Sequence, residues 1–206
     1  MYHRLMAGIT AFVLAGGKSS RMGADKAFIE LAGRSLLSRA LEVAAGVADQ
    51  VFLVGRNPKL AEFGTLVPDI FPERGPLGGI HAALTSTTTE LNLMVAVDMP
   101  YLESNLLRYL VDRANRCGAL VTVPRVNGKF QPLCAVYRRT FVEMAGRAMA
   151  EDRNKIDALF VPDEIETVTE DELKAQGFSP LMFANVNTPE ELEKARNQMP
   201  DVRGRE

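Results

Sequence analysis

The feature that most constrains the fold is a short apolar run that leads directly into a glycine-rich loop. Residues 9–15 (ITAFVLA) are apolar apart from Thr10, and the loop LAGGKSSRMGADK over residues 14–26 continues from them. A short apolar run that ends in glycines is typical of a central parallel strand buried on both faces. We therefore expect an α/β protein with this strand inside its sheet.

Strand-like and helix-like segments alternate after this loop. Apolar runs of this kind predict further strands over residues 50–54, 66–68, 91–97 and 119–123. Helices are expected over residues 35–44 and 104–115, with another beginning near Gly78. Strands separated by helices predict right-handed βαβ crossovers and hence a mostly parallel sheet.

The second half of the chain has a different pattern. Asn127-Gly128 between short extended runs predicts a β-hairpin with a type I′ turn and a return strand over residues 131–137. A capping box of Thr188 and Glu191, with Pro189 between them, predicts the start of a helix. The other expected elements are helices over residues 141–150 and 155–160 and a strand over residues 183–187. Because no repeat or linker interrupts the chain, residues 1–206 are expected to form one domain.

The composition limits the classes of partner. The 206 residues are 47% hydrophobic with a net charge of −2, which permits a sizeable core and gives no general attraction to nucleic acids or membranes. Cys117 and Cys134 have no metal-ligand spacing and stand in apolar contexts, so free buried thiols in a reducing cytoplasm are expected. The apolar run near the N-terminus is interrupted and leads into the glycine loop, so it predicts neither a signal peptide nor a membrane span.

The glycine loop fails two common nucleotide-binding motifs. Gly17-Lys18-Ser19 looks like the end of a Walker A motif, but the first glycine of that motif would stand where the chain has Phe12. A dinucleotide-binding GxGxxG pattern also fails, because Gly16 and Gly17 are adjacent and the next glycine is Gly23. Neither a P-loop NTPase nor a redox dinucleotide enzyme is therefore expected.

The residues of the loop nevertheless favour a polyphosphate ligand. Gly16 and Gly17 let the backbone approach a ligand closely, and backbone N–H groups at such a bend bind anionic oxygens. Arg21 offers a planar fork for phosphate and Lys26 offers a point charge. The alternative is a plain strand-to-helix turn with solvated basic side chains.

Carboxylates follow two of the other expected strands. Asp98, in Asp98-Met99-Pro100, comes directly after the strand over residues 91–97, and ligands of open α/β sheets bind at the carboxyl ends of strands. Because Mg²⁺ takes one or two carboxylates together with substrate phosphates, Asp98 is the expected metal ligand; the alternative is a turn or N-cap aspartate. Asp69 begins a long loop that leads through residues 75–79 into a helix, whose N-terminus favours anions.

Three of these segments resemble one enzyme family. LAGGKSSRMGADKA resembles the signature LAGGxSxRMGxDKA of the molybdenum cofactor guanylyltransferases, which are nucleotide-diphospho-sugar transferase-like nucleotidyltransferases. Asp98-Met99-Pro100 resembles the D-x-P motif of that family, and residues 75–79 (GPLGG) resemble its GPLxG segment. The resemblance implies a three-layer, Rossmann-like α/β fold with a mostly parallel sheet and a β-hairpin insertion. It also implies transfer of GMP from GTP to the phosphate of molybdopterin, with release of pyrophosphate and with Mg²⁺ as cofactor.

The resemblance further implies roles for individual residues. Arg21, Lys26 and Asp98 are the expected catalytic residues, and Asp98 is also the expected Mg²⁺ ligand. The expected nucleotide contacts are Leu14, Ala15, Gly16, Gly17, Lys26, Asp69, Gly78 and Asp98. Two segments that resemble the acceptor side of the family supply Gln131, Asn185 and Asn187 as candidate molybdopterin contacts.

The sequence leaves alternatives open for the base of the nucleotide and for the reaction. Gly16 stands where related cytidylyltransferases more often have alanine, which favours guanine. Some family members have an asparagine after the second strand that contacts guanine, whereas this chain has Val54 there and Asn57 three residues later. A nucleotidyltransferase that uses CTP or a sugar-phosphate acceptor, and a non-catalytic adaptor that delivers the cofactor, both stay open. The expected protein partners are molybdoenzymes or other cofactor-synthesis proteins.

Overall fold

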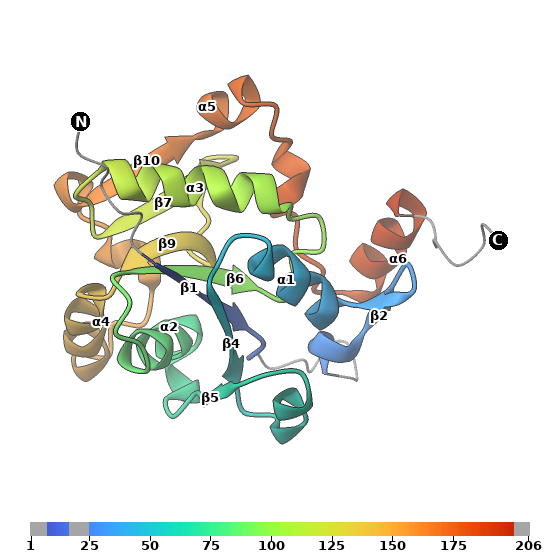
Figure 1. The fold of residues 1–206 in the computed structure, drawn as a ribbon, viewed down its shortest axis with the longest axis horizontal. Helices are drawn as coiled ribbons and strands as arrows, with labels where there is room; N and C mark the ends of the chain where they lie inside the picture. Colours follow the sequence, from blue (N-terminus) through green and yellow to red (C-terminus); the bar gives the residue numbers. More distant parts are fainter. Residues whose placement is uncertain (1–7, 17–24, 200–206) are drawn as a thin grey trace.

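The computed structural model describes residues 8–16 and 25–199, and a mixed sheet runs through them (Figure 1). Its strands are β1 (Ile9–Leu14), β4 (Gln50–Gly55), β5 (Leu66–Pro68), β6 (Leu91–Ala96), β7 (Val121–Val126), β8 (Lys129–Phe130), β9 (Cys134–Arg138) and β10 (Ile165–Thr169). Their order is β10-β7-β9-β6-β1-β4-β5, with β8 paired to β7. The β1–β4, β1–β6, β4–β5 and β7–β10 pairs are parallel, so the predicted mostly parallel sheet is confirmed.

β1 is buried on both faces, as its apolar sequence predicts. Ala11 and Val13 point into one hydrophobic core, and Phe12 and Leu14 point into a second core on the opposite face. This division follows from the alternation of side chains along a strand. Apolar residues at successive positions are therefore what a central strand covered on both sides requires.

Helices cover the two faces and make three layers (Figure 1). α1 (Leu36–Ala45) and α3 (Ser104–Arg116) contribute to the core of Ala11 and Val13. α2 (Pro76–Thr85) and α4 (Phe141–Ala150) contribute to the core of Phe12 and Leu14. These helices begin within two residues of the predicted starts, and α1 is capped by the Ser35 side chain, which accepts a hydrogen bond from the Ser38 N–H group at 3.0 Å.

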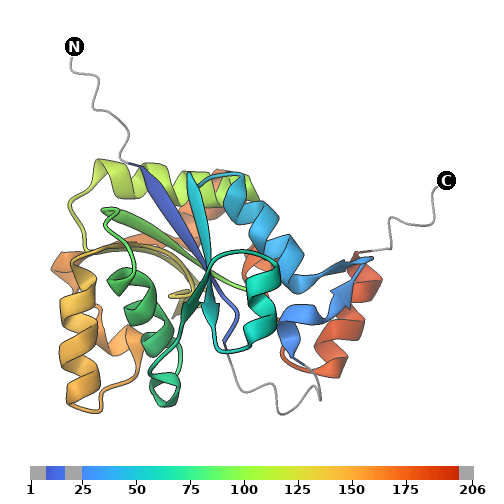
Figure 2. The same ribbon diagram turned by 60° about the horizontal axis from the view of Figure 1, so that its bottom comes forward.

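A small antiparallel hairpin and the last helix stand together at one end of the molecule. The hairpin consists of β2 (Glu30–Leu31) and β3 (Arg34–Ser35), and α6 (Pro189–Gln198) lies beside it (Figure 2). The predicted capping box of α6 is present, because Thr188 and Glu191 exchange side-chain and backbone hydrogen bonds. Residues from distant parts of the chain thus meet where the glycine loop ends.

The hairpin prediction is correct in its turn and wrong in its return strand. Asn127 and Gly128 have φ values of 51° and 73°, which a type I′ turn requires. The return strand is β8, which is only Lys129–Phe130, because Gln131 to Leu133 turn away. β9 then inserts antiparallel between β6 and β7. The predicted strand over residues 131–137 therefore starts at Cys134 and pairs mainly with β6.

Two other predicted elements differ from the structure. Residues 155–160 hold a short 3-10 helix, Ile156–Leu159, and not an α-helix. Pro162 disfavours a helical conformation at Val161, so the segment does not extend into a longer helix. Residues 184–187 are irregular, and the predicted strand over 183–187 is wrong. Phe183 and Val186 are buried three positions apart, a spacing that the alternation of a strand does not allow.

The structure adds four short elements, and it also bears on the predicted thiols and on the question of a membrane span. β10, β2, β3 and α5 (Glu170–Ala175) are short elements that the sequence analysis did not predict. Cys117 and Cys134 are free thiols, and burial raises the pKa of Cys134 to about 12. Within the described ranges, the helices are too short or too polar to cross a membrane.

Gly78 lets the loop after β5 approach the first turn of α2. A Cβ atom at this position would lie 2.3 Å from the Phe71 carbonyl oxygen, whereas a Cβ at Gly79 would meet only ordinary contacts, the nearest at 3.4 Å. Gly78→Ala is therefore expected to lower the free energy of unfolding by about 1–3 kcal/mol. Gly79→Ala, the matched control, is expected to change it by less than about 1 kcal/mol, since alanine favours a helix. Urea unfolding followed by circular dichroism compares them, and equal stabilities would contradict the close approach.

Candidate active site

Three polar side chains from distant parts of the sequence meet at one edge of the sheet. Lys26 Nζ lies 3.5 Å from Asp98 Oδ2 and donates a hydrogen bond of 2.5 Å to Asn187 Oδ1. Lys26 and Asp98 are each about four-fifths buried, with side-chain exposures of 21% and 22%. The structure thus joins a predicted phosphate-binding lysine, a predicted metal ligand and a predicted acceptor residue in one cluster.

Parallel strand pairing places Asp98 beside the glycine loop. Leu14, the last residue of β1, is aligned with Ala96, the last residue of β6. The Val97 N–H group then donates to the Leu14 carbonyl at 3.2 Å, so the two strands remain together for one residue beyond the ladder. Asp98 and Gly16 each stand two positions past their strand, at the carboxyl edge where α/β sheets bind ligands.

The segment before α6 is held to the same edge by its backbone. The Val186 N–H group donates to the Asp98 carbonyl at 2.9 Å. Glu191 accepts hydrogen bonds from the N–H groups of Asn187 at 2.6 Å and Thr188 at 3.1 Å. These contacts orient Asn187 toward Lys26. The sequence predicts Glu191 only as a helix cap. Its spacing from Thr188 accounts for the bond to the Thr188 N–H group, and the additional bond to Asn187 has no separate signal in the sequence.

Burial governs the charge state of Asp98. It raises the pKa of this carboxyl group above its ordinary value, and the nearby charge of Glu191 raises it further. Lys26 opposes both effects through its charge and a hydrogen bond, but the net direction is upward. The ionised carboxylate is therefore incompletely neutralised by Lys26 and would gain from a second cation.

Asp69 and Gly78 stand farther along the same edge, after β5. Asp69 Oδ1 accepts a hydrogen bond from the Phe71 N–H group at 3.0 Å, and burial raises the pKa of its carboxyl group despite that bond. A Cβ atom on Gly78 would lie 3.2 Å from the same carboxylate oxygen. The two predicted nucleotide contacts are therefore neighbours, at the N-terminus of α2.

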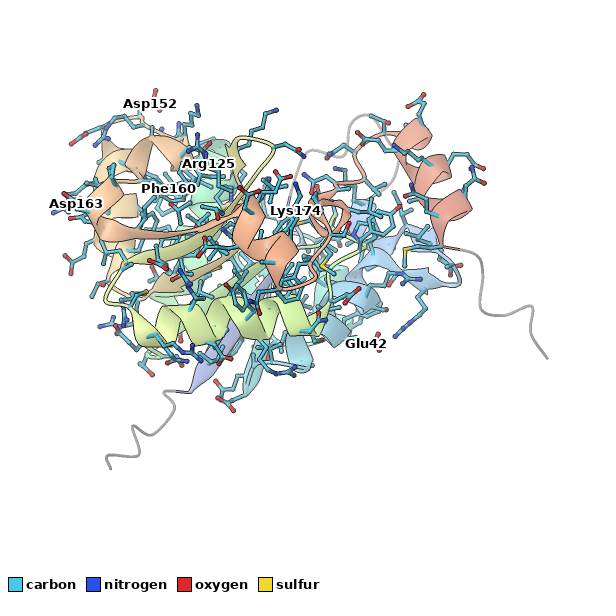
Figure 3. The ribbon with its side chains drawn as sticks, turned by 90° about the horizontal axis from the view of Figure 1, so that it is seen from above. Glu42, Arg125, Asp152, Phe160, Asp163 and Lys174 are labelled. Carbon is cyan, nitrogen blue, oxygen red and sulfur yellow. The ribbon has the colours of Figure 1, made fainter. Side chains whose placement is uncertain are left out.

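The candidate acceptor residues are divided between two places. Gln131 lies in the turn between β8 and β9, where its N–H group donates to the Pro124 carbonyl at 2.9 Å. Asn185 is exposed, and Asn187 is the one that contacts Lys26. The hairpin near Gln131 also carries Arg125, whose guanidinium stacks over the Phe130 ring at 5.4 Å. The Phe130 ring in turn lies 5.2 Å from the Phe160 ring, and Figure 3 labels Arg125 and Phe160 on the same side of the molecule.

The remaining predicted residues belong to the glycine loop itself. Leu14 and Ala15 are buried, and the Ala15 N–H group donates to the Val54 carbonyl at 2.8 Å. Gly16 is exposed, and a Cβ atom there would meet no atom within 4 Å. Arg21 and Gly17 lie outside the described residues.

The donor set at this edge suits a cation that the substrate also binds. Within residues 8–16 and 25–199, no three His, Cys, Asp or Glu side chains gather into a metal cluster. Mg²⁺ does not need such a cluster, because it commonly takes one or two carboxylates together with phosphate oxygens and water. Asp98, largely buried and only partly neutralised by Lys26, fits that requirement.

A separate cavity has a volume of about 280 Å³. It is lined by Arg39, Glu42, Val43, Pro100, Tyr101, Leu102, Glu103, Ser179, Leu181, Met182 and Met199. The predicted site residues that the structure describes do not border it. The size of this cavity is therefore a weaker guide to the site than the convergence of charged groups at the sheet edge.

The fold is that of an α/β protein with a polar cluster at the carboxyl edge of its sheet, and comparison with known proteins specifies the class. The model of the MobA-like NTP transferase domain matches residues 11–163. A protein of Desulfosudis oleivorans named molybdenum cofactor guanylyltransferase is 34% identical over 197 residues, which cover 92% of this chain and 95% of that protein.

Solved structures agree with this match. Molybdopterin-guanine dinucleotide biosynthesis protein A from Archaeoglobus fulgidus superimposes with a TM-score of 0.79 at 25% identity, over 92% of this chain and 97% of its own. CMP:2-keto-3-deoxy-manno-octonic acid synthetase superimposes with a TM-score of 0.73 at 14% identity over 94% and 98%, which shows a shared fold. The chain belongs to the MobA-like NTP transferase family, with relatives named molybdenum cofactor guanylyltransferase, and it is a nucleotidyltransferase.

The raised pKa of Asp98 predicts how stability depends on pH. From the ordinary value of 3.8 up to the raised value, the folded protein binds more protons than the unfolded chain, so ionisation of Asp98 destabilises the fold as pH rises. Asp98→Asn cannot ionise. Its stability relative to wild type is therefore expected to increase with pH above 3.8 and then to level off.

Chemical denaturation of both proteins at several pH values, without nucleotide or metal, measures this difference. Asp163→Asn is the matched control, because this exposed aspartate lies elsewhere on the surface (Figure 3). If Asp98→Asn were less stable than wild type at neutral pH, with a gap that closes in acid, the attraction to Lys26 would outweigh burial and the assigned direction would be wrong.

Proposed function

We propose that this chain transfers GMP from GTP to the terminal phosphate of molybdopterin and releases pyrophosphate, and that residues 1–206 act as one domain. The observation that carries the proposal is the meeting of Lys26, at the end of the glycine loop, with Asp98 at the carboxyl edge of β6. The names of the relatives supply the guanine nucleotide and the acceptor.

The proposed reaction is an in-line displacement at the α-phosphorus of GTP. The attacking group is a phosphate oxygen that is already anionic, so the protein need not supply a general base. Repulsion between the two anionic substrates is the main obstacle, and positioning and charge neutralisation are the means to overcome it. Lysine has three N–H donors. Lys26 can therefore donate to Asn187, remain beside Asp98 and still donate to a phosphate oxygen.

Other residues have roles on the nucleotide side. We propose that the backbone of Leu14, Ala15, Gly16 and Gly17 receives the nucleotide, with Asp69 and Gly78 bordering the base and Arg21 sharing the phosphate charge with Lys26. Asp98 would hold Mg²⁺, which when bound draws charge from the phosphate oxygens. On the acceptor side, Gln131, Asn185 and Asn187 would face molybdopterin.

A nucleotide-selectivity assay tests the proposal. The purified full chain is mixed with molybdopterin, Mg²⁺ and either GTP or CTP, and the release of pyrophosphate is followed. The proposal expects release with GTP and much less with CTP. A preference for CTP would contradict the base assignment. Absence of release with any nucleoside triphosphate, combined with retained binding of molybdopterin, would identify a non-catalytic adaptor instead.

Removal of either charged group is expected to slow this reaction. Lys26→Ala and Asp98→Ala should each lower turnover by about a hundredfold or more, the scale observed when one preorganised charge-stabilising group is removed. Lys174→Ala and Asp163→Ala remove the same charges from surface positions seen in Figure 3 and should leave turnover within about twofold. Steady-state kinetics of the four variants gives the comparison, and near-wild-type turnover in the first two would refute the assigned roles.

A further inference from the structure

The exit of β4 carries a side chain that reaches the end of the glycine loop. Asn57 Nδ2 donates a hydrogen bond of 2.7 Å to Asp25 Oδ2, and Asp25 directly precedes Lys26. Both residues are partly buried. Because Lys26 belongs to the proposed site, a contact that restrains its neighbour bears directly on the position of the lysine.

The geometry leaves little freedom to the Asn57 amide group. Asn57 caps the 3-10 helix η2 (Pro58–Glu62), and its Oδ1 atom accepts from the Lys59 N–H group at 3.0 Å. Since one end of the amide is an acceptor and the other a donor, this cap directs Nδ2 toward Asp25. The donor is therefore oriented before any ligand arrives.

Asp25 is oriented in a similar way. Its Oδ1 atom accepts from the Ala27 N–H group at 3.1 Å and caps the 3-10 helix η1 (Lys26–Phe28), which leaves Oδ2 for Asn57. A second contact joins η1 to the residue that follows η2, because the rings of Phe28 and Phe63 lie 5.8 Å apart. η1 is thus attached to the β4–β5 connection at two points.

β4 and the residues that follow it form hydrogen bonds to both described ends of the glycine loop. At the first end, the Ala15 N–H group bonds to the Val54 carbonyl of β4. At the second end, Asp25 bonds to Asn57, three residues after Val54. A lysine side chain has many rotamers, so fixing its backbone reduces the conformations that compete with the one touching Asp98.

We propose that Asn57 is a positioning residue for nucleotide transfer, which acts through Asp25 to place Lys26. The inference rests on the proposed function of Lys26. Among the described residues, Asn57 forms side-chain hydrogen bonds to Asp25 and Lys59 and none to Lys26 or Asp98, so it acts on these two through the backbone of η1. Asn57 stands three residues past Val54, the position of the guanine contact in some family members, and its proposed role is to hold the end of the glycine loop at Asp25.

Asn57→Asp separates this role from helix capping. Aspartate is as good an N-cap as asparagine, so η2 stays capped, but the donor that faced Asp25 becomes a second carboxylate. The expected result is a fall in kcat/KM for GTP of about ten- to a hundredfold, the scale of one hydrogen bond to a charged group. Asn105→Asp, which adds the same charge at an exposed position in α3, is the control and should change kcat/KM by less than about twofold.

The reciprocal pair tests the contact itself. In Asp25→Asn/Asn57→Asp the donor and the acceptor exchange places, and both caps retain an oxygen. Amide hydrogen exchange over residues 25–28 of the ligand-free protein should be faster in Asn57→Asp and return toward the wild-type rate in the double variant. The kcat/KM of the double variant for GTP should likewise recover in part.

The outcomes separate the two claims. If Asn57→Asp has unchanged kcat/KM, or if the double variant exchanges as fast as the single variant, the positioning role is overturned. If the wild-type protein transfers no nucleotide from GTP, the proposed function fails, while hydrogen exchange in the ligand-free protein still shows whether Asn57 restrains η1.

Discussion

Parallel pairing of β1 with both β4 and β6 is the constraint on which the site depends. It brings three strand ends to one edge, and each end delivers a different component: the glycine loop after Leu14, Asn57 after Gly55 and Asp98 after Ala96. None of these components would be close to the others on a sheet of another order. The two cores that bury β1 on both faces fix the register of this pairing. A slip of one residue would move every side chain of β1 into the core on the opposite face.

The site holds a charged group at a position where its burial destabilises the fold. Asp98 is largely buried, and Lys26 compensates for only part of the cost of its ionisation. Its ionisation lowers stability at neutral pH, and in the proposed function the carboxylate gains further partners when the nucleotide phosphates and Mg²⁺ bind. Destabilising groups of this kind are common at functional sites, and the stability of the rest of the fold offsets their effect.

Chain segments far from the glycine loop complete the arrangement. The stretch before α6 was expected to form a strand, because asparagines alternate with apolar residues there. Instead its backbone makes one hydrogen bond to Asp98, and the capping box of Thr188 and Glu191 begins the helix immediately afterwards. Local pattern identified the cap correctly, but only the position of this segment against β6 decided that Asn187 would contact Lys26.

The sequence alone determined the features that depend on near neighbours. The buried strand β1, the hairpin turn at Asn127-Gly128, the capping box of α6 and the location of Asp98 at a strand end all follow from local periodicity and turn chemistry. The tertiary structure decided which distant groups meet. Lys26 and Asn187 are 161 positions apart, Asn57 reaches Asp25 across 32 positions, and β9 inserts between β6 and β7. Local patterns carry no information on such distances, since strand order and packing set them only when the whole sheet is assembled.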